Sequence, residues 1–302
     1  MRRGILQLCL AGAITVLALA AVVTGASAAQ PEPWGTGFQL PATILAEQVA
    51  WFEGYTLVII IAITVFVLLL LLIVIFRFSR ARNPNASRTS HNTTVEVIWT
   101  VVPVLILVMI AFPSFRLLYQ HETIPTPDLT VKATGAQWYW GYEYMDGDLE
   151  GVSFISYMLS DEERLARMEE FGLTEREVPR NLAVDFPLVV PAGATVHVLT
   201  TSSDVNHAWG VPAFGIKKDS IQGRLNETWF RVNEPGTYFG QCYELCGRSH
   251  AFMPIEVVAL EPQRFEEWSA LAADDMNGAN ALLLRWQAEA RGETPVAALA
   301  AE

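Results

Sequence analysis

The 302-residue chain contains only three cysteines, and none of them belongs to a Cys-x-x-Cys-His motif. Because a c-type haem is attached through that motif, no haem of this kind is fused to the chain. Basic residues are also scarce, with 20 Lys and Arg against 32 Asp and Glu and a formal net charge of -12. This balance argues against binding to nucleic acid and favours either a basic partner or simple solubility. The sequence has no internal repeat and no low-complexity tract.

Apolar residues, in contrast, make up 52% of the chain, and many of them lie in three segments near the N-terminus. The first segment follows two arginines and ends in small residues at 26–28, which is typical of a secretory signal. We therefore assign residues 1–29 to a cleaved signal peptide. The alternative is a lipid anchor on Cys9, but the bulky Leu8 precedes that cysteine, which also lies very early in the chain.

The other two apolar segments, 57–76 and 97–115, each have about the length that a membrane-spanning helix needs. They predict a hairpin within residues 30–120, with helices at about 55–78 and 95–117. The loop between them carries four arginines and no acidic residue. By the positive-inside rule this loop is cytoplasmic, so both ends of the mature chain are expected in the periplasm. The predicted location is a bacterial inner membrane.

Short β-rich stretches separated by turn residues dominate the chain after the hairpin. They lie at about 129–133, 138–144, 188–190, 195–201, 228–232, 237–241 and 255–260. This spacing predicts an all-β domain over residues 121–262, with antiparallel strands in a sandwich or barrel. A charged, helix-prone stretch at 160–179 interrupts the domain, and we interpret it as a surface insertion. Helical spacing returns after Pro262 and predicts a helical extension and tail over 263–302.

Two of the three cysteines, Cys242 and Cys246, lie in the loop GQCYELCGRSHAFMPIE. Outside the cytoplasm such a pair usually forms a disulfide, and a redox-active dithiol is a second possibility. The same loop contains His250 and Met253, and His207 lies farther upstream. Thiolate, imidazole and thioether form the soft ligand set that selects copper. Because a mononuclear blue-copper site needs one cysteine only, the second cysteine favours two copper ions bridged by both thiolates.

The pattern CYELCGRSHAFM, the upstream histidine and the aromatic string QWYWGYEY together closely resemble the cytochrome c oxidase subunit II family. The resemblance runs from the hairpin to about residue 260. It implies a two-helix transmembrane hairpin followed by an all-β cupredoxin-like Greek-key domain that holds the binuclear copper centre CuA. The implied side-chain ligands are His207, Cys242, Cys246, His250 and Met253, and Glu244 matches the residue that contributes its main-chain oxygen. The Glu244 side chain matches a magnesium ligand at the boundary with the catalytic subunit.

The resemblance also implies a function in electron transfer. A subunit of this kind accepts electrons from cytochrome c and passes them to haem-copper centres in catalytic subunit I, which reduces oxygen to water with proton pumping. The haem is then expected only in the partner subunit, and the other implied partners are the remaining oxidase subunits and the membrane. Trp138 matches the electron entry point, and Glu96 matches a residue at the entrance of a proton-uptake path. Glu143, Asp204 and Asp219 lie in segments that match an acidic docking surface for cytochrome c.

Each of these assignments has a simpler alternative. Trp138 could be an ordinary strand residue, Glu96 a charge favoured at a helix N-terminus, and the three acids plain solvated charges.

Rival families also differ from this chain in identifiable ways. The related quinol oxidase subunit lacks the copper ligands, and nitrous oxide reductase carries the same motif on a soluble enzyme. A membrane-tethered copper chaperone or thiol oxidoreductase would have one anchor and a thioredoxin-type alternation of strands and helices.

Overall fold

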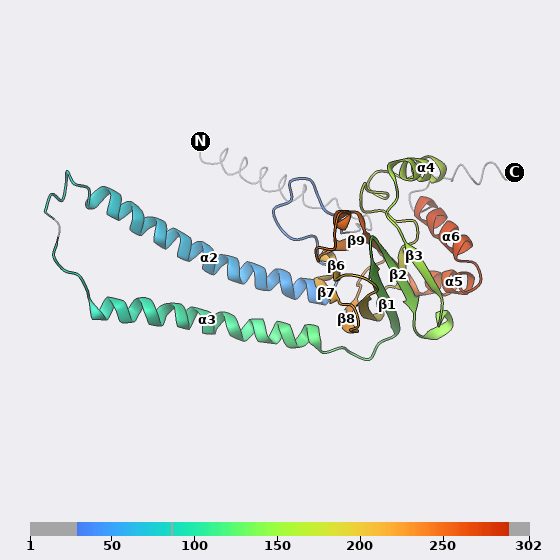
Figure 1. Cartoon of the computed structure of the whole chain (residues 1–302), viewed down its shortest axis with the longest axis horizontal. Coiled ribbons are helices and arrows are strands. Elements are labelled where there is room, and N and C mark those ends of the chain that lie inside the picture. The colour runs from blue at the N-terminus through green and yellow to red at the C-terminus, as the bar shows by residue number, and fades with distance from the viewer. Residues whose placement is uncertain (1–28, 86, 290–302) are drawn as a thin grey trace, which may run out of the picture.

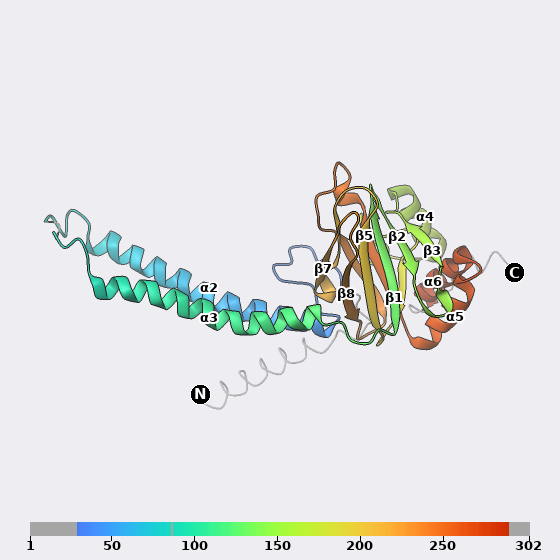
Figure 2. The ribbon, with the colours of Figure 1, turned by 60° about the horizontal axis from the view of Figure 1, so that its bottom comes forward.

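The computed structural model describes residues 29–85 and 87–289. A long helical hairpin projects from one side of a β domain, and three helices lie on the side of that domain away from the hairpin (Figures 1 and 2). The predicted signal peptide lies almost wholly outside the described residues, as does the tail beyond residue 289. The fold class predicted from the sequence, a transmembrane-type hairpin followed by a cupredoxin-like β domain, is confirmed.

The hairpin consists of α2 (Ile44–Arg77) and α3 (Thr93–Glu122). Both helices are long and apolar enough to cross a membrane, and their apolar stretches are not buried within the chain itself. Helix α2 begins well before the predicted residue 55 because its start is anchored on the β domain. The Thr43 hydroxyl caps the helix by accepting from Ala46 N at 3.1 Å, and it donates to Phe214 O at 2.8 Å.

Ten strands form the β domain within the described residues. They are β1 (Leu129–Ala136), β2 (Tyr139–Tyr144), β3 (Ser153–Ser156), β4 (Leu188–Pro191), β5 (Thr195–Ser202), β6 (His207–Val211), β7 (Ile216–Ser220), β8 (Asn226–Arg231), β9 (Gly236–Cys242) and β10 (Pro254–Leu260). The strand orders of the two sheets are β3-β2-β1-β5-β8 and β4-β10-β9-β6-β7. Side chains from both sheets share one apolar core, which makes the domain a sandwich.

Both sheets are mixed, so the prediction of purely antiparallel strands is wrong in one respect. Strand β1 pairs parallel with β5, and β4 pairs parallel with β10, whereas the other named pairs are antiparallel. Parallel neighbours need crossover connections, which turn signals between adjacent strands do not reveal. The aromatic string also contributes to the core: Trp140, Tyr142 and Tyr144 of β2 are buried, and the Tyr144 hydroxyl donates to Val189 O in the other sheet at 2.7 Å.

The 160–179 insertion packs more closely than a loose surface loop would. It contains helix α4 (Asp161–Phe171), which begins with a capping box formed by Ser160 and Glu163. Helices α5 (Pro262–Ala272) and α6 (Met276–Glu289) follow the last strand. Residues around α4 form a second small core with α6, made of Leu159, Phe171, Leu173, Val178, Ala183, Leu284 and Ala288. The insertion and the C-terminal extension therefore stabilise each other.

A buried carboxylate joins this helical region to the sheet. Glu256 of β10 is 5% exposed and accepts a hydrogen bond from Val184 N at 2.9 Å. Arg167 of α4 donates to Val184 O at 2.8 Å, so the strand and the insertion meet at the same peptide segment. Burial raises the pKa of Glu256 to about 7, although the hydrogen bond from Val184 and the charge of Arg167 oppose the rise.

We expect Glu256→Gln to stabilise the protein at pH 8 and to change little at pH 5. The folded pKa of about 7 lies above the ordinary value of 4.5, so the native chain retains a proton that the unfolded chain releases. The free energy of unfolding of the wild type should therefore fall as the pH rises from about 4.5, the pKa in the unfolded chain, through about 7. The total loss should be up to about 3 kcal/mol. The amide of the variant does not ionise, so the variant should not show this loss. Urea unfolding of the full-length protein in detergent, followed by tryptophan fluorescence at both pH values, measures it. The exposed Glu261→Gln is the control, and an equal effect of Glu256→Gln at both pH values would contradict the assignment.

Candidate metal centre

Pairing of β6 with β9 brings the predicted ligands together at one end of the sandwich. His207 is the first residue of β6, and Cys242 is the last residue of β9. These strands run antiparallel, with Trp209 opposite Cys242, so the start of one lies beside the end of the other. The loop that follows Cys242 then carries Cys246, and His250 begins the short helix η3 (His250–Phe252).

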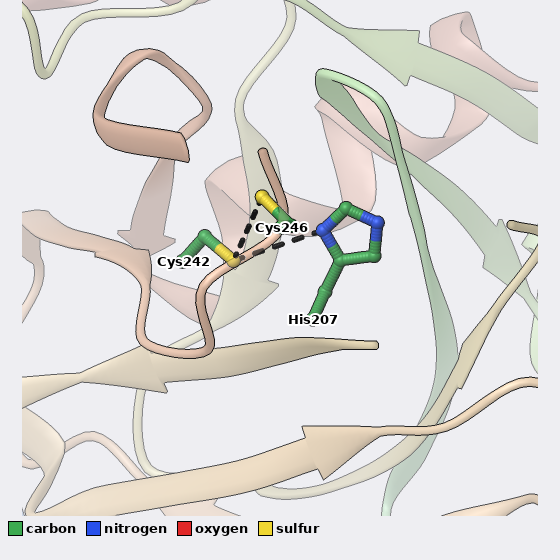
Figure 3. A group of neighbouring side chains, drawn as sticks. All are labelled: His207, Cys242 and Cys246. Atoms are coloured by element: carbon green, nitrogen blue, oxygen red, sulfur yellow. Dashed lines mark hydrogen bonds between the residues drawn. The ribbon is translucent and has the colours of Figure 1, made fainter. Parts of the chain in front are cut away.

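The two sulfur atoms lie at the centre of the site. Cys242 Sγ and Cys246 Sγ are 3.9 Å apart, which is well beyond the S–S bond length of about 2 Å, and both cysteines are free and buried. Cys242 Sγ is 3.7 Å from His207 Nδ1 (Figure 3). On the other side, Cys246 Sγ is 3.4 Å from His250 Nδ1. Each sulfur therefore has one imidazole nitrogen beside it.

Two weaker donors complete the cluster. Met253 Sδ lies 3.5 Å from Cys246 Sγ, and the main-chain oxygen of Glu244 lies 3.3 Å from Cys242 Sγ. The site is thus approximately symmetric about the two cysteine sulfurs. Each has one imidazole and one weak donor beside it, a carbonyl at Cys242 and a thioether at Cys246. This set of soft donors fits two copper ions better than a hard cation such as calcium or magnesium.

Electrostatics gives a second reason to expect a cation here. Burial raises the pKa of Cys246 to about 12, and the neighbouring Cys242 adds to the rise. For Cys242, burial alone would also raise the pKa, but hydrogen bonds involving His207 and the main chain at Ala208 hold it below the ordinary value. One thiol therefore ionises far more readily than the other. A bound cation would favour the thiolate form of both, and His207, Cys242 and Cys246 offer ligand atoms within 4.8 Å of one another.

Asp204 orients the upstream histidine. His207 Nε2 is 2.9 Å from Asp204 Oδ1, which leaves Nδ1 directed to the sulfur atoms. Burial alone would lower the pKa of His207, but its hydrogen bonds to Cys242 and Asp204 outweigh burial and raise it. The same carboxylate also accepts from Gln137 N at 2.7 Å and from Val205 N at 2.6 Å. Its side chain is 32% exposed, so this predicted docking residue is largely engaged inside the site.

We expect Asp204→Asn to weaken copper binding by about tenfold or more, as is common when a residue that hydrogen-bonds to a metal ligand is replaced. The amide cannot accept from both His207 and Gln137 N, so one of these contacts is lost. Competition with a chelator on the full-length protein measures the affinity. Asp219→Asn removes the same charge from an exposed residue of β7 and should leave the affinity unchanged. Equal affinities in both variants would show that Asp204 does not position the ligand.

Residues of the aromatic string donate hydrogen bonds to two main-chain carbonyls of the cysteine loop. The half-buried Trp138 donates from its indole nitrogen to Cys246 O at 3.2 Å, and Gln137 Nε2 donates to the same oxygen at 2.8 Å. The buried Trp140 donates to Met253 O at 3.2 Å, and its ring lies edge-on to the His207 ring with centroids 6.0 Å apart. Gln137 and Trp140 were not predicted as site residues. Their only signal in the sequence is their place in the string QWYWGYEY.

Three of the other predicted acidic residues lie at the surface beside lysines. Glu143 is 3.0 Å from Lys132 Nζ, and Asp219 is 3.6 Å from Lys217 Nζ. The Glu244 side chain is 45% exposed and lies 4.0 Å from the same Lys217 nitrogen. These charges therefore share their surface with lysines, which the sequence reasoning did not consider.

Glu96 lies at the other end of the molecule, at the start of α3 and far along the hairpin from the β domain (Figure 1). Its carboxylate accepts from Asn92 N at 3.1 Å, while Asn92 Oδ1 accepts from Val95 N at 3.2 Å. Glu96 therefore takes part in capping the helix.

The chain is similar in sequence to several known proteins. A family model described as the periplasmic domain of cytochrome c oxidase subunit II matches residues 129–260, and one described as its transmembrane domain matches residues 31–117. Cytochrome c oxidase subunit 2 of Cereibacter sphaeroides is 44% identical over 272 residues, which cover 86% of this chain and 89% of that protein. The probable subunit 2 of Rickettsia bellii is 42% identical over 257 residues, covering 85% and 91%. A crystal structure of the periplasmic domain of subunit II from Bradyrhizobium japonicum shares 43% identity, covers 50% of this chain and 96% of that chain, and has a TM-score of 0.42.

Proposed function

Because the chain belongs to the cytochrome c oxidase subunit II family, we propose that its β domain holds the binuclear CuA centre and receives electrons there from cytochrome c. The chain is a membrane-anchored subunit of a haem-copper oxidase. The observation that carries the proposal is the pair of free, buried sulfur atoms, each with an imidazole nitrogen beside it. A disulfide or a dithiol would not require those histidines.

The contacts between the donor atoms support a proposed role for each ligand. When bound, a pair of copper ions would supply a centre that stores one electron, and the thiolates of Cys242 and Cys246 would hold it. Cys242 and Cys246 are the proposed bridges, and His207 and His250 the terminal ligands. Met253 and the Glu244 main-chain oxygen are the proposed weak ligands.

The protein around this site resists rearrangement. Gln137 and Trp138 hold the carbonyl of Cys246, and Trp140 holds that of Met253. The imidazole of His207 is held by Asp204. These hydrogen bonds restrain both the ligand residues and the main chain, which suits electron transfer because little reorganisation is then needed. Burial of both cysteines also keeps bulk water away from the thiolates.

Trp138 is the proposed entry point for the electron. It is half-buried, so part of its ring is accessible to a docked partner, and its indole nitrogen contacts the carbonyl of a cysteine ligand. Glu143, Asp219 and the exposed part of Asp204 are proposed to attract a basic donor such as cytochrome c.

Glu244 is proposed to link copper to magnesium. Its main-chain oxygen lies beside Cys242, while its side chain is accessible at the surface near Lys217. The carboxylate is thus free to take part in a magnesium site completed by the catalytic subunit, provided that Lys217 moves aside.

The proposed topology places both termini in the periplasm and the arginine-rich loop in the cytoplasm, after removal of residues 1–29. The loop charges support this orientation, as does the anchoring of α2 on the exported β domain through Thr43. The proposed domains are the hairpin region 30–120, the copper domain 121–262 and the extension 263–302.

Copper analysis of the purified full-length protein tests the function. Two copper ions per chain and a mixed-valence seven-line EPR spectrum are expected, because both thiolates bridge. One copper ion, or none, would instead support a chaperone or a thiol oxidoreductase.

We expect Glu96→Gln to slow steady-state oxygen reduction by the assembled oxidase while leaving reduction of copper by cytochrome c unchanged. Copper reduction should be unchanged because Glu96 lies at the end of the hairpin opposite the copper domain. Oxygen reduction should slow because the residue is expected at the entrance of a proton-uptake path. Turnover and stopped-flow copper reduction are measured on the same preparation. Asn92→Ala is the matched control because it removes the hydrogen bond to Val95 N and keeps the carboxylate. If both variants slowed turnover equally, Glu96 would act only as a helix cap.

A further inference from the structure

The two long helices enclose a groove at the end of the hairpin nearest the β domain. Its volume is about 470 Å³, and its walls come from the first turns of α2 and the last turns of α3. Its apolar lining consists of Trp51, Phe52, Phe112, Pro113 and Leu117. Three polar residues also line it, Gln48, Arg116 and Gln120. An apolar cleft of this size with a few polar groups is typical of a small-molecule site.

The groove lies at the level of lipid headgroups. The charge-free apolar stretches are 57–76 in α2 and 97–115 in α3, and these mark the hydrocarbon layer. Arg116 directly follows the second stretch, and Trp51 lies six residues before the first, which is roughly 10 Å at the helical rise. Trp51 stacks on Tyr55 with ring centroids 5.7 Å apart, as expected for an aromatic belt at a membrane interface.

Two of the polar groups in the groove have no partner in the described part of the chain. Arg116 takes part in none of the ion pairs there, although it sits at the edge of the hydrocarbon layer. Gln48 Oε1 is buried and accepts no hydrogen bond there. A buried acceptor without a donor is costly, and an exposed arginine at the membrane interface is placed to attract an anionic headgroup. Within the described residues, the groove therefore offers one cation and one acceptor to a bound molecule.

We propose that this groove binds one phospholipid from the membrane leaflet on the β-domain side, with a headgroup that carries a hydrogen-bond donor. The phosphate pairs with the Arg116 guanidinium, and a hydroxyl or ammonium group of the headgroup donates to Gln48 Oε1. The first part of the acyl chains packs on Phe52 and Phe112. Phosphatidylglycerol and phosphatidylethanolamine meet these requirements, whereas phosphatidylcholine offers the phosphate but no N–H or O–H donor. The proposal rests on the hairpin crossing the membrane, and not on the copper site.

Such a lipid would fill the space between two helix ends that are each tied to the β domain. Thr43 anchors the start of α2 on Phe214, and Glu122 at the end of α3 pairs with Lys218 of β7 at 3.0 Å.

Lipid titration of the intact oxidase tests the proposal. The complex is delipidated in mild detergent, phosphatidylglycerol is added, and retained lipid is counted by native mass spectrometry. Arg116→Gln should weaken binding of one lipid by about tenfold, the size expected for a lost charge-assisted hydrogen bond. Arg224→Gln removes the same charge from the exposed surface of the β domain and should have no effect. Phosphatidylcholine should compete poorly with phosphatidylglycerol in the wild type.

A photoreactive phenylalanine analogue in place of Phe112 identifies the occupant directly. We expect adducts with the mass of a phospholipid, and these should decrease in the Arg116→Gln background. The same analogue at Phe66, which lies within the apolar stretch of α2, should label lipid independently of Arg116. Crosslinking of position 112 mainly to another subunit would overturn the proposal, as would lipid labelling that does not depend on Arg116. Copper content serves as a separate readout and should be unchanged in every variant.

Discussion

Cys242→Ser is expected to reduce the copper content from two ions per chain to one or fewer and to abolish the mixed-valence EPR signal. Cys242 Sγ lies 3.7 Å from His207 Nδ1 and 3.9 Å from Cys246 Sγ, so it is one of the two sulfur atoms at the centre of the site. A serine hydroxyl stays protonated at neutral pH and is a hard ligand, so it replaces neither the charge nor the softness of a thiolate. The remaining cysteine cannot bridge two ions symmetrically and keep both imidazoles in place.

Two controls separate this loss from misfolding. Serine has nearly the same shape as cysteine, so thermal unfolding of the metal-free variant should resemble that of the metal-free wild type. Met253→Leu should retain two copper ions, because a thioether is a weak ligand that mainly tunes the reduction potential. A seven-line EPR spectrum surviving in Cys242→Ser would exclude the binuclear assignment. Loss of all copper from Met253→Leu would show that the thioether holds the metal instead of tuning it.

Trp138→Phe is expected to lower the rate of electron transfer within the cytochrome c complex by at least about tenfold, equivalent to about 1.4 kcal/mol in the activation barrier. The indole nitrogen contacts Cys246 O at 3.2 Å, and a phenyl ring has no atom to replace this bond. Gln137 still holds the same carbonyl at 2.8 Å, so the loop should keep its conformation. The affinity for the donor and its dependence on salt should therefore change little.

Stopped-flow reduction of copper across a salt series measures both effects. The matched comparison is Glu143→Gln combined with Asp219→Asn, which should slow association at low salt, with a deficit that shrinks as salt screens the attraction. Asp204 is left intact in this variant because it holds His207. A Trp138→Phe variant with altered affinity only, or a charge variant equally slow at all salt concentrations, would refute this division of roles.

Sequence alone was sufficient where the relevant residues are close together in the chain. Two apolar stretches of spanning length predicted the hairpin, because the bilayer sets helix length directly. The spacing of Cys242, Cys246, His250 and Met253 within one loop likewise pointed to a soft-metal site, because short spacing lets one loop surround a metal. Most strands were found from their β-rich composition. Strands β3, β6 and β7 were not predicted, because they are short and their β-branched and aromatic residues are too few to form a recognisable run.

Tertiary structure decided everything that depends on contacts between distant segments. His207 reaches Cys242, 35 residues later in the chain, only through the pairing of β6 with β9. A side chain at Gly135 would come within 2.7 Å of the His207 ring, so glycine leaves the space that this ligand occupies. The orientation of His207 by Asp204 and the packing of the insertion against α6 are contacts of the same kind. Periodicity and composition indicate which residues tend to be buried or hydrogen-bonded. Which residue each of them contacts depends on how the fold brings distant segments together.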